Sequence, residues 1–157
     1  MGTSPPPVGA RRKDSKATSP EAGSRGGAFR DYPGIVDRAG VATWMDAYRD
    51  AWISNEPAAI GALFTDDALY SIDAFAEPWR GREEIVRRWT AGIAQQVAFT
   101  YEVEAIEGDV AVVHWHVFTQ NVGDPIRVEY DGLLQLRFAP DGRCAEHREW
   151  FFRRELG

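Results

Sequence analysis

The feature that most constrains the fold is a series of alternating segments in the second half of the chain. Polar and apolar residues alternate over residues 98–106, 110–119, 126–138 and 143–152. A period of two is typical of strands with one buried face. Turn-forming residues separate these segments, at 107–109, 121–125 and 140–142. We therefore expect four consecutive strands that form an antiparallel meander.

Three helical segments precede the predicted meander. Trp44, Met45, Tyr48, Ala51 and Trp52 recur every three or four residues, which predicts an amphipathic helix from residue 41 to 54. Pro57 is suited to open a short helix that runs to Leu63. A third helix is expected over 81–89, with Glu83 and Glu84 in its first turn, where the helix dipole favours acidic residues. Residues 64–70 resemble a turn leading into a short strand, and 73–80 a loop. Helices followed by a meander predict an α+β fold, with three N-terminal helices on one face of a curved antiparallel sheet.

Length and composition indicate one domain with a tail. The chain has 157 residues, enough for a single core. Residues 1–27 are rich in Pro, Gly, Ser, Arg and Lys, which predicts a disordered tail. Residues 28–40 are expected to form a leading segment that covers an edge of the folded domain at 41–153.

Several functional classes are disfavoured. The net charge of −6 argues against nucleic-acid binding. Cys144 is the only cysteine, which excludes an intrachain disulfide and favours the cytoplasm. No apolar run approaches the ~20 residues of a membrane helix. No glycine-rich phosphate loop is present, so we expect no nucleotide cofactor.

Glu149 is the principal candidate for chemistry. It lies in a strand segment of bulky aromatic residues, where a carboxylate is costly unless it is paired or used. In an aromatic pocket its pKa would rise, which suits a general acid or base. The alternatives are an ion pair with Arg127 or Arg137, or exposure to solvent.

Two histidines raise a question of strand register. His114 and His116 flank Trp115, so both share one face of the strand and Trp115 lies on the other. If Trp115 lines a pocket, the histidines lie outside it. A register shift of one residue would instead bring His114 to Glu149. A third ligand for a metal is missing, because His147 is on a different strand, so we expect no metal site.

Asp131 and Gly132 lie in the middle of a predicted strand. Glycine inside a strand indicates a bulge or a close backbone approach by a ligand. Asp131 is then either a second acid near the mouth of the pocket or a solvent-side residue beside Arg127 and Arg148.

Three segments together carry a family resemblance: Phe64–Tyr70, Gly81–Val86 and Asp141–Trp150. In this order they resemble the SnoaL-like group of the nuclear-transport-factor-2-like superfamily, which is related to polyketide cyclases, limonene epoxide hydrolases and ketosteroid isomerases. The resemblance covers about residues 41–152. It implies a cystatin-like cone whose curved sheet wraps three helices around an apolar pocket, often in a homodimer.

The resemblance also implies roles for particular residues. Glu149 lies where the cyclases and epoxide hydrolases place an acid–base Asp, and Tyr70 matches a pocket tyrosine. The epoxide hydrolases also use an Arg-x-Asp pair, at whose positions this chain has Trp115 and Val117. This difference argues against epoxide hydrolysis.

These observations predict a cofactor-free isomerase or cyclase that acts on a hydrophobic cyclic molecule, with Glu149 and Tyr70 catalytic. The predicted substrate-binding residues are Trp44, Tyr48, Phe64, Trp79, Trp115, His114 and Asp131. The alternative is a ligand-binding or dimerisation scaffold without chemistry, in which tryptophans fill the interior. We also expect a homodimer formed through the outer face of the sheet.

Overall fold

A computed structural model describes residues 36–91, 94–121 and 125–156, all within one compact unit, Tyr32–Gly157. The predicted tail at 1–27 lies outside the described residues. The elements are α1 (Arg38–Ser54), α2 (Pro57–Ala62), β1 (Phe64–Ser71), β2 (Trp79–Arg80), α3 (Arg82–Thr90), β3 (Ala94–Glu107), β4 (Val110–Asn121), β5 (Arg127–Phe138) and β6 (Cys144–Leu156). No helix among the described residues is long and apolar enough to cross a membrane.

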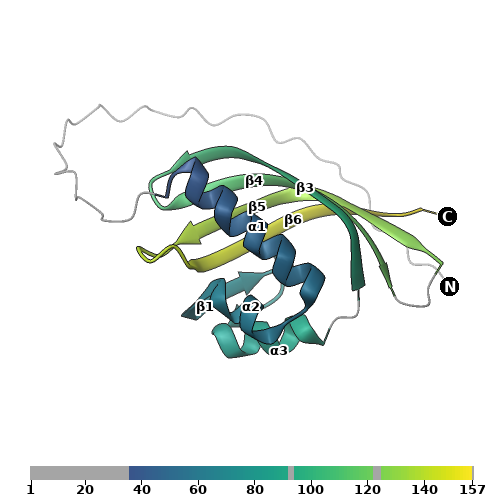
Figure 1. The fold of residues 1–157 in the computed structure, drawn as a ribbon, viewed down its shortest axis with the longest axis horizontal. Coiled ribbons are helices and arrows are strands. Elements are labelled where there is room, and N and C mark those ends of the chain that lie inside the picture. The colour runs from purple at the N-terminus through teal and green to yellow at the C-terminus, as the bar shows by residue number, and fades with distance from the viewer. Residues whose placement is uncertain (1–35, 92–93, 122–124, 157) are drawn as a thin grey trace, which may run out of the picture. The chain divides into compact units, whose positions relative to one another are not determined.

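The strands form one six-stranded sheet in the order β2-β1-β6-β5-β4-β3. Strands β3 to β6 make the predicted antiparallel meander, and α1 lies across one face of it (Figure 1). The opposite edge of the sheet, made by β1 and β2, differs from the sequence prediction. Residues 64–71 form a complete strand that pairs parallel to β6, and Trp79 and Arg80, predicted as loop, pair with β1. The sheet is therefore mostly antiparallel, with one parallel pair.

Helix α1 begins earlier than the sequence pattern predicted. Asp37 caps its N-terminus by accepting a hydrogen bond of 2.7 Å from the backbone amide of Gly40, so the helix starts at Arg38 rather than at Val41. Residues 38–40, predicted to belong to the leading segment, are thus its first turn. The helix ends at Ser54 and is followed by Asn55, which adopts a left-handed conformation and caps it. Four of the five residues predicted for its apolar face, Trp44, Met45, Tyr48 and Ala51, are buried together with Val41, while the fifth, Trp52, is half-buried.

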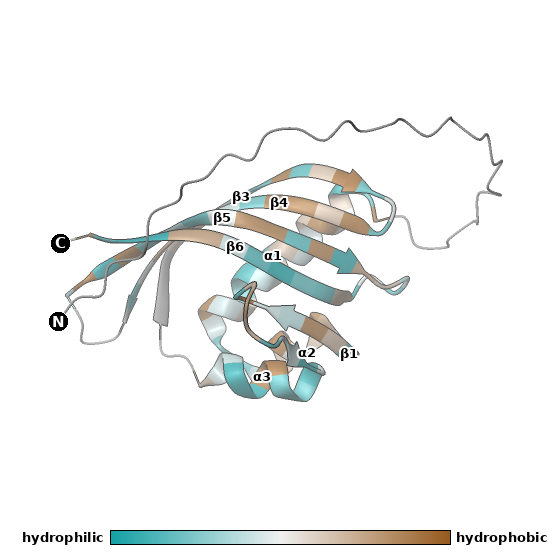
Figure 2. Cartoon of the chain, turned by 180° about the vertical axis from the view of Figure 1, so that it is seen from behind, coloured by the Kyte–Doolittle hydropathy of each residue, from teal (hydrophilic) through white to brown (hydrophobic). Residues whose placement is uncertain are grey.

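The two faces of the meander differ in character. On β4 the buried residues are Ala111, Val113, Trp115, Val117 and Thr119, while His114 and His116 alternate with them on the opposite face. We call the face that carries Trp115 the inner face and the other the outer face. Figure 2 shows the hydrophobic and hydrophilic residues mixed along these strands. The strand register therefore follows the alternation in the sequence, without the one-residue shift.

Gly132 marks a close approach between two strands. It lies opposite Phe151 of β6, and a Cβ at this position would lie 2.2 Å from the carbonyl oxygen of Trp150. No side chain fits that distance, so only glycine allows β5 and β6 to approach in this way. The approaching backbone is therefore that of β6, where the sequence analysis had considered a ligand.

Candidate functional site

Two buried tyrosines meet on the inner face. Tyr48 comes from α1 and Tyr70 from β1, and their hydroxyl oxygens lie 3.1 Å apart in a hydrogen bond. Burial raises the pKa of both phenols well above the usual value, and the nearby Glu149 carboxylate raises it further. One hydroxyl donates to the other, so one phenolic proton of the pair is left to donate elsewhere.

Glu149 of β6 lies on the inner face near these tyrosines. Its register partner on β5 is Leu134, which is buried, and Leu134 in turn lies opposite Val113 of β4. Among the described residues Glu149 makes neither a hydrogen bond nor an ion pair. Burial alone raises its pKa to about 8. The ion pairs considered from the sequence do not form, because Arg137 binds Asp109 and Glu146 while Arg127 lies over the ring of Phe118.

Aromatic rings surround the tyrosines. Tyr48 contacts Trp44 and Trp89, with ring centroids 5.1 and 5.2 Å apart. Trp52 bridges from Tyr48 to Trp115, at 5.9 and 6.1 Å. These side chains project from α1, α3 and β4, so the helices and the sheet enclose the interior together.

His147 was not selected as a site residue from the sequence, although it lies two residues before Glu149 on the same face. It is completely buried, and neither of its ring nitrogens has a hydrogen-bond partner in the described structure. Burial lowers its pKa to about 3, so its imidazole is neutral near pH 7. The indole nitrogen of Trp115 is likewise buried and unpartnered. The sequence does contain a signal for His147, because a spacing of two residues from Glu149 places both side chains on one face of a strand.

The predicted site residues separate into two groups. Seven of them lie together in the interior: Trp44, Tyr48, Phe64, Tyr70, Trp79, Trp115 and Glu149. His114 and Asp131 lie instead on the outer face, where a ring nitrogen of His114 is 3.2 Å from either carboxylate oxygen of Asp131. These two residues therefore lie outside the interior group, although they line one surface hollow together with Glu149.

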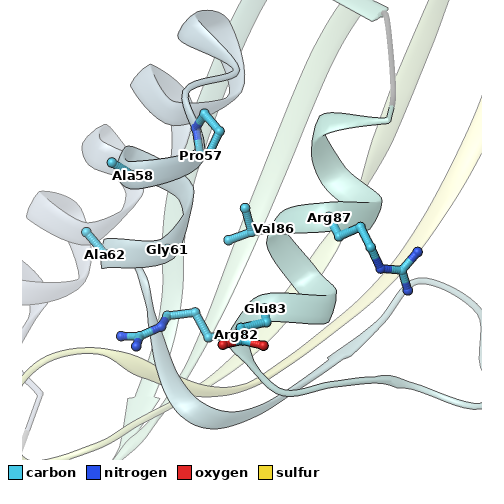
Figure 3. A pocket seen from close by; sticks show the side chains of 8 residues that line it. All are labelled: Pro57, Ala58, Gly61, Ala62, Arg82, Glu83, Val86 and Arg87. Atoms are coloured by element: carbon cyan, nitrogen blue, oxygen red, sulfur yellow. The ribbon is translucent and has the colours of Figure 1, made fainter.

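Surface hollows reach the interior group at its margin, where Glu149 lines one of them and Trp44 lines another. One, of about 590 Å³, separates α2 from α3 and is lined by Gly61, Val86 and their neighbours (Figure 3). Its Arg82 pairs with Asp66 at 3.0 Å. Another, of about 600 Å³, is lined by Glu149 together with residues of the outer face that include His114, Asp131 and Trp150. Within the described ranges no three or more His, Cys, Asp or Glu side chains gather in a way that could hold a metal ion.

The fold and the interior define an α+β domain of the cystatin-like type, with three helices before a curved sheet. The chain belongs to the family of SnoaL-like domains, whose model matches residues 45–147. None of the curated proteins matches the chain.

Solved structures share this fold at low sequence identity. An LEH-like epoxide hydrolase from M. tuberculosis is 18% identical with a TM-score of 0.58, over 73% of this chain and 84% of its own. A protein with a ketosteroid isomerase-like fold from Catenulispora acidiphila, in complex with trimethylamine, is 23% identical with a TM-score of 0.58, over 68% and 83%. A computationally designed 17-OHP binder is 12% identical with a TM-score of 0.61, over 74% and 98%. At these identities the similarity establishes the fold alone.

Proposed function

We propose that this domain binds a hydrophobic cyclic small molecule in its interior, and that Glu149 acts there as a general acid and base in a cofactor-independent isomerisation or cyclisation. The observation that carries the proposal is a carboxylate without a partner among the described residues, whose pKa of about 8 lies close to neutral pH, next to a hydrogen-bonded pair of tyrosines. A pKa near the working pH is what general acid–base catalysis requires. Tyr70 and Tyr48 are the proposed donors to a developing oxyanion.

The proposed reaction begins with removal of a proton next to a ketone. The ionised carboxylate of Glu149 takes the proton from carbon, and the electron pair of the broken C–H bond forms an enolate. The free phenolic proton of the Tyr48–Tyr70 pair donates a hydrogen bond to the enolate oxygen. Glu149, now protonated, returns its proton to another carbon in an isomerisation. In a cyclisation the enolate carbon attacks a second carbonyl of the same molecule, and Glu149 protonates the resulting alkoxide.

The family and its solved relatives support this class of ligand. One relative was solved with trimethylamine and another was designed to bind 17-OHP, so the fold accommodates small organic molecules. Trp115 and Val117 point inward at the positions where the resemblance would require an Arg-x-Asp pair for epoxide opening. Indole and isopropyl groups cannot activate a water molecule, which favours proton transfer over epoxide hydrolysis.

Hydrogen–deuterium exchange of a ketone tests the catalytic role without knowledge of the natural substrate. We expect the protein to accelerate exchange of the protons next to the carbonyl of 2-tetralone in D₂O, measured by NMR. Glu149→Gln keeps the shape of the side chain and removes the base, so the rate should fall by about 10²–10⁴-fold while binding persists. Exchange that proceeds equally fast in Glu149→Gln would contradict a catalytic Glu149.

A second function, ligand binding without chemistry, is favoured by the dense contacts among the interior rings. Trp52 contacts Tyr48, Trp89, Phe99 and Trp115, with ring centroids between 5.9 and 6.5 Å. Binding of 2-tetralone by the wild-type protein without accelerated exchange would select this alternative. Native mass spectrometry of protein purified from its own host would then identify a retained ligand.

A homodimer through the outer face completes the proposal. Large hydrophobic side chains are exposed on this face or beside it: Ile72, Phe75, Leu133, Trp150 and Phe152. Exposed apolar residues gathered on one face favour an interface. We expect sedimentation velocity to show a dimer at micromolar concentration and Trp150→Lys to shift it toward monomer. A wild-type monomer would refute the interface. The single buried thiol of Cys144 supports a cytoplasmic setting.

A further inference from the structure

His147 is unusual among the interior residues, because both of its polar ring atoms are buried without a partner in the described structure. Its side chain is fully buried, and within the described structure neither ring nitrogen has a partner. A neutral imidazole carries one N–H donor and one nitrogen acceptor. Buried polar groups almost always find partners in native proteins, so two unpartnered atoms on one ring need an explanation.

Stacking fixes the ring plane of His147 but does not explain the choice of histidine. Tyr70 and His147 are register partners on parallel strands, and their rings stack 4.0 Å apart at 4°. Tyr48 lies nearly parallel as well, at 5.7 Å and 17°. Phenylalanine would stack in the same way without unpartnered nitrogens. What distinguishes histidine is the polar edge of the ring, which the stack holds in a fixed direction.

Resting on the proposed ligand site, we propose that His147 is a specificity-determining residue, whose ring edge hydrogen-bonds an uncharged hydroxyl group of the hydrophobic ligand. A hydroxyl both donates and accepts, as a neutral imidazole does. The neighbouring groups in this part of the interior are aromatic rings and phenols, which suit an apolar body around that hydroxyl. Trp89 is half-buried and contacts both tyrosines, at 5.2 and 5.9 Å, so it is the partly exposed ring beside which a ligand would enter.

Two probes of the same size test this role. 2-Naphthol carries a hydroxyl where 2-methylnaphthalene carries a methyl group, so the ratio of their dissociation constants reports recognition of the hydroxyl. Binding can be followed by quenching of tryptophan fluorescence at pH 7. We expect the wild-type protein to prefer 2-naphthol by about tenfold or more, the effect of one net hydrogen bond. In His147→Phe the preference should fall to about twofold or less, with binding of 2-methylnaphthalene retained.

The possible outcomes separate the two proposals. If both probes bind and His147→Phe keeps the preference, the role of His147 is wrong and the ligand site stands. If the wild-type protein binds neither probe, the ligand site is wrong and the role of His147 falls with it. If His147→Phe fails to fold, an NMR measurement on the wild-type protein still tests the role of His147. The ¹⁵N shift of a His147 ring nitrogen should change with 2-naphthol and stay constant with 2-methylnaphthalene, and equal shifts would overturn the role.

Discussion

Ionisable side chains on the two faces of the same strands differ in whether they are paired. On the outer face these groups are paired: His114 with Asp131 at 3.2 Å, His116 with Glu129 at 2.7 Å, and Arg154 with Glu129. On the inner face Glu149 and His147 have no such partner among the described residues. Paired charges at a surface are ordinary, whereas unpartnered ionisable groups in an interior cost stability and point to a functional site.

A single cause acts on both inner groups. Burial disfavours whichever form is charged, so it raises the pKa of Glu149 to about 8 and lowers that of His147 to about 3. At neutral pH the acid is therefore mostly protonated, the minor ionised fraction serves as the proposed base, and the imidazole is neutral. The interior therefore presents polar and mostly uncharged groups at neutral pH, which suits an uncharged hydrophobic ligand.

The largest expected effect concerns Gly132, where β5 and β6 approach each other closely. We expect Gly132→Ala to reduce the free energy of unfolding by about 3 kcal/mol or more, because the added Cβ would lie 2.2 Å from the carbonyl oxygen of Trp150. Urea unfolding followed by tryptophan fluorescence measures the loss. Gly108→Ala is a control with open space around the added Cβ: nothing lies within 4 Å of it, so the expected cost is only that of the left-handed backbone, which Gly132 does not have. Equal losses in the two variants would show that the approach of β6 is not the cause.

The next largest effect is the dependence of the unfolding free energy on pH, which Glu149 on the inner face should cause. An unfolded Glu titrates at about 4.3, so the folded protein holds a proton that the unfolded chain releases between that pH and about 8. The stability of the wild-type protein therefore falls as pH rises through this window. Glu149→Gln removes the titration. Its unfolding free energy should gain about 2–3 kcal/mol relative to wild type between pH 5 and pH 9, a figure reduced for the partial exposure of the side chain.

Glu146 supplies the matched control for Glu149. It lies on β6 and faces outward, where Arg137 and Arg148 pair with it. Glu146→Gln should show no comparable gain toward high pH. A gain of similar size in both variants would mean that the inner carboxyl group is not distinctive.

How much the sequence could predict depends on how local each signal is. The alternation around Trp115 predicted its inward position and the outward position of His114, because strand parity depends only on neighbouring residues. The strand at 64–71 was predicted only as a turn and a short strand. Its parallel pairing with β6 joins segments far apart in sequence, which a local pattern does not reveal. His147 was overlooked for a similar reason. Its stack on Tyr70 and its lack of partners depend on which strand β1 lies beside.

A smaller effect, with the opposite dependence on pH, is expected for His147. The unfolded side chain titrates near 6.5, while the folded one stays neutral to about pH 3. The wild-type protein therefore loses stability as pH falls below 6.5. His147→Phe cannot take up that proton and should be more stable than wild type by about 1–2 kcal/mol at pH 5, with a smaller difference at pH 7. Chemical denaturation at both values measures it. A difference independent of pH would mean that His147 does not titrate as described.

The smallest effect is expected on the outer face, where the comparison predicts little cost for a lost charge. Asp131 and His114 are both well exposed, with side-chain exposures of 55% and 40%. An exposed pair contributes about 0–1 kcal/mol and is weakened by salt. Asp131→Asn should therefore change the unfolding free energy by less than about 1 kcal/mol at submicromolar protein concentration, and by less still in 1 M NaCl. A cost that grows with protein concentration would place this pair inside the proposed dimer interface, because association would then bury it and link its loss to assembly. A loss of 2 kcal/mol or more in the dilute monomer would break the distinction between the two faces.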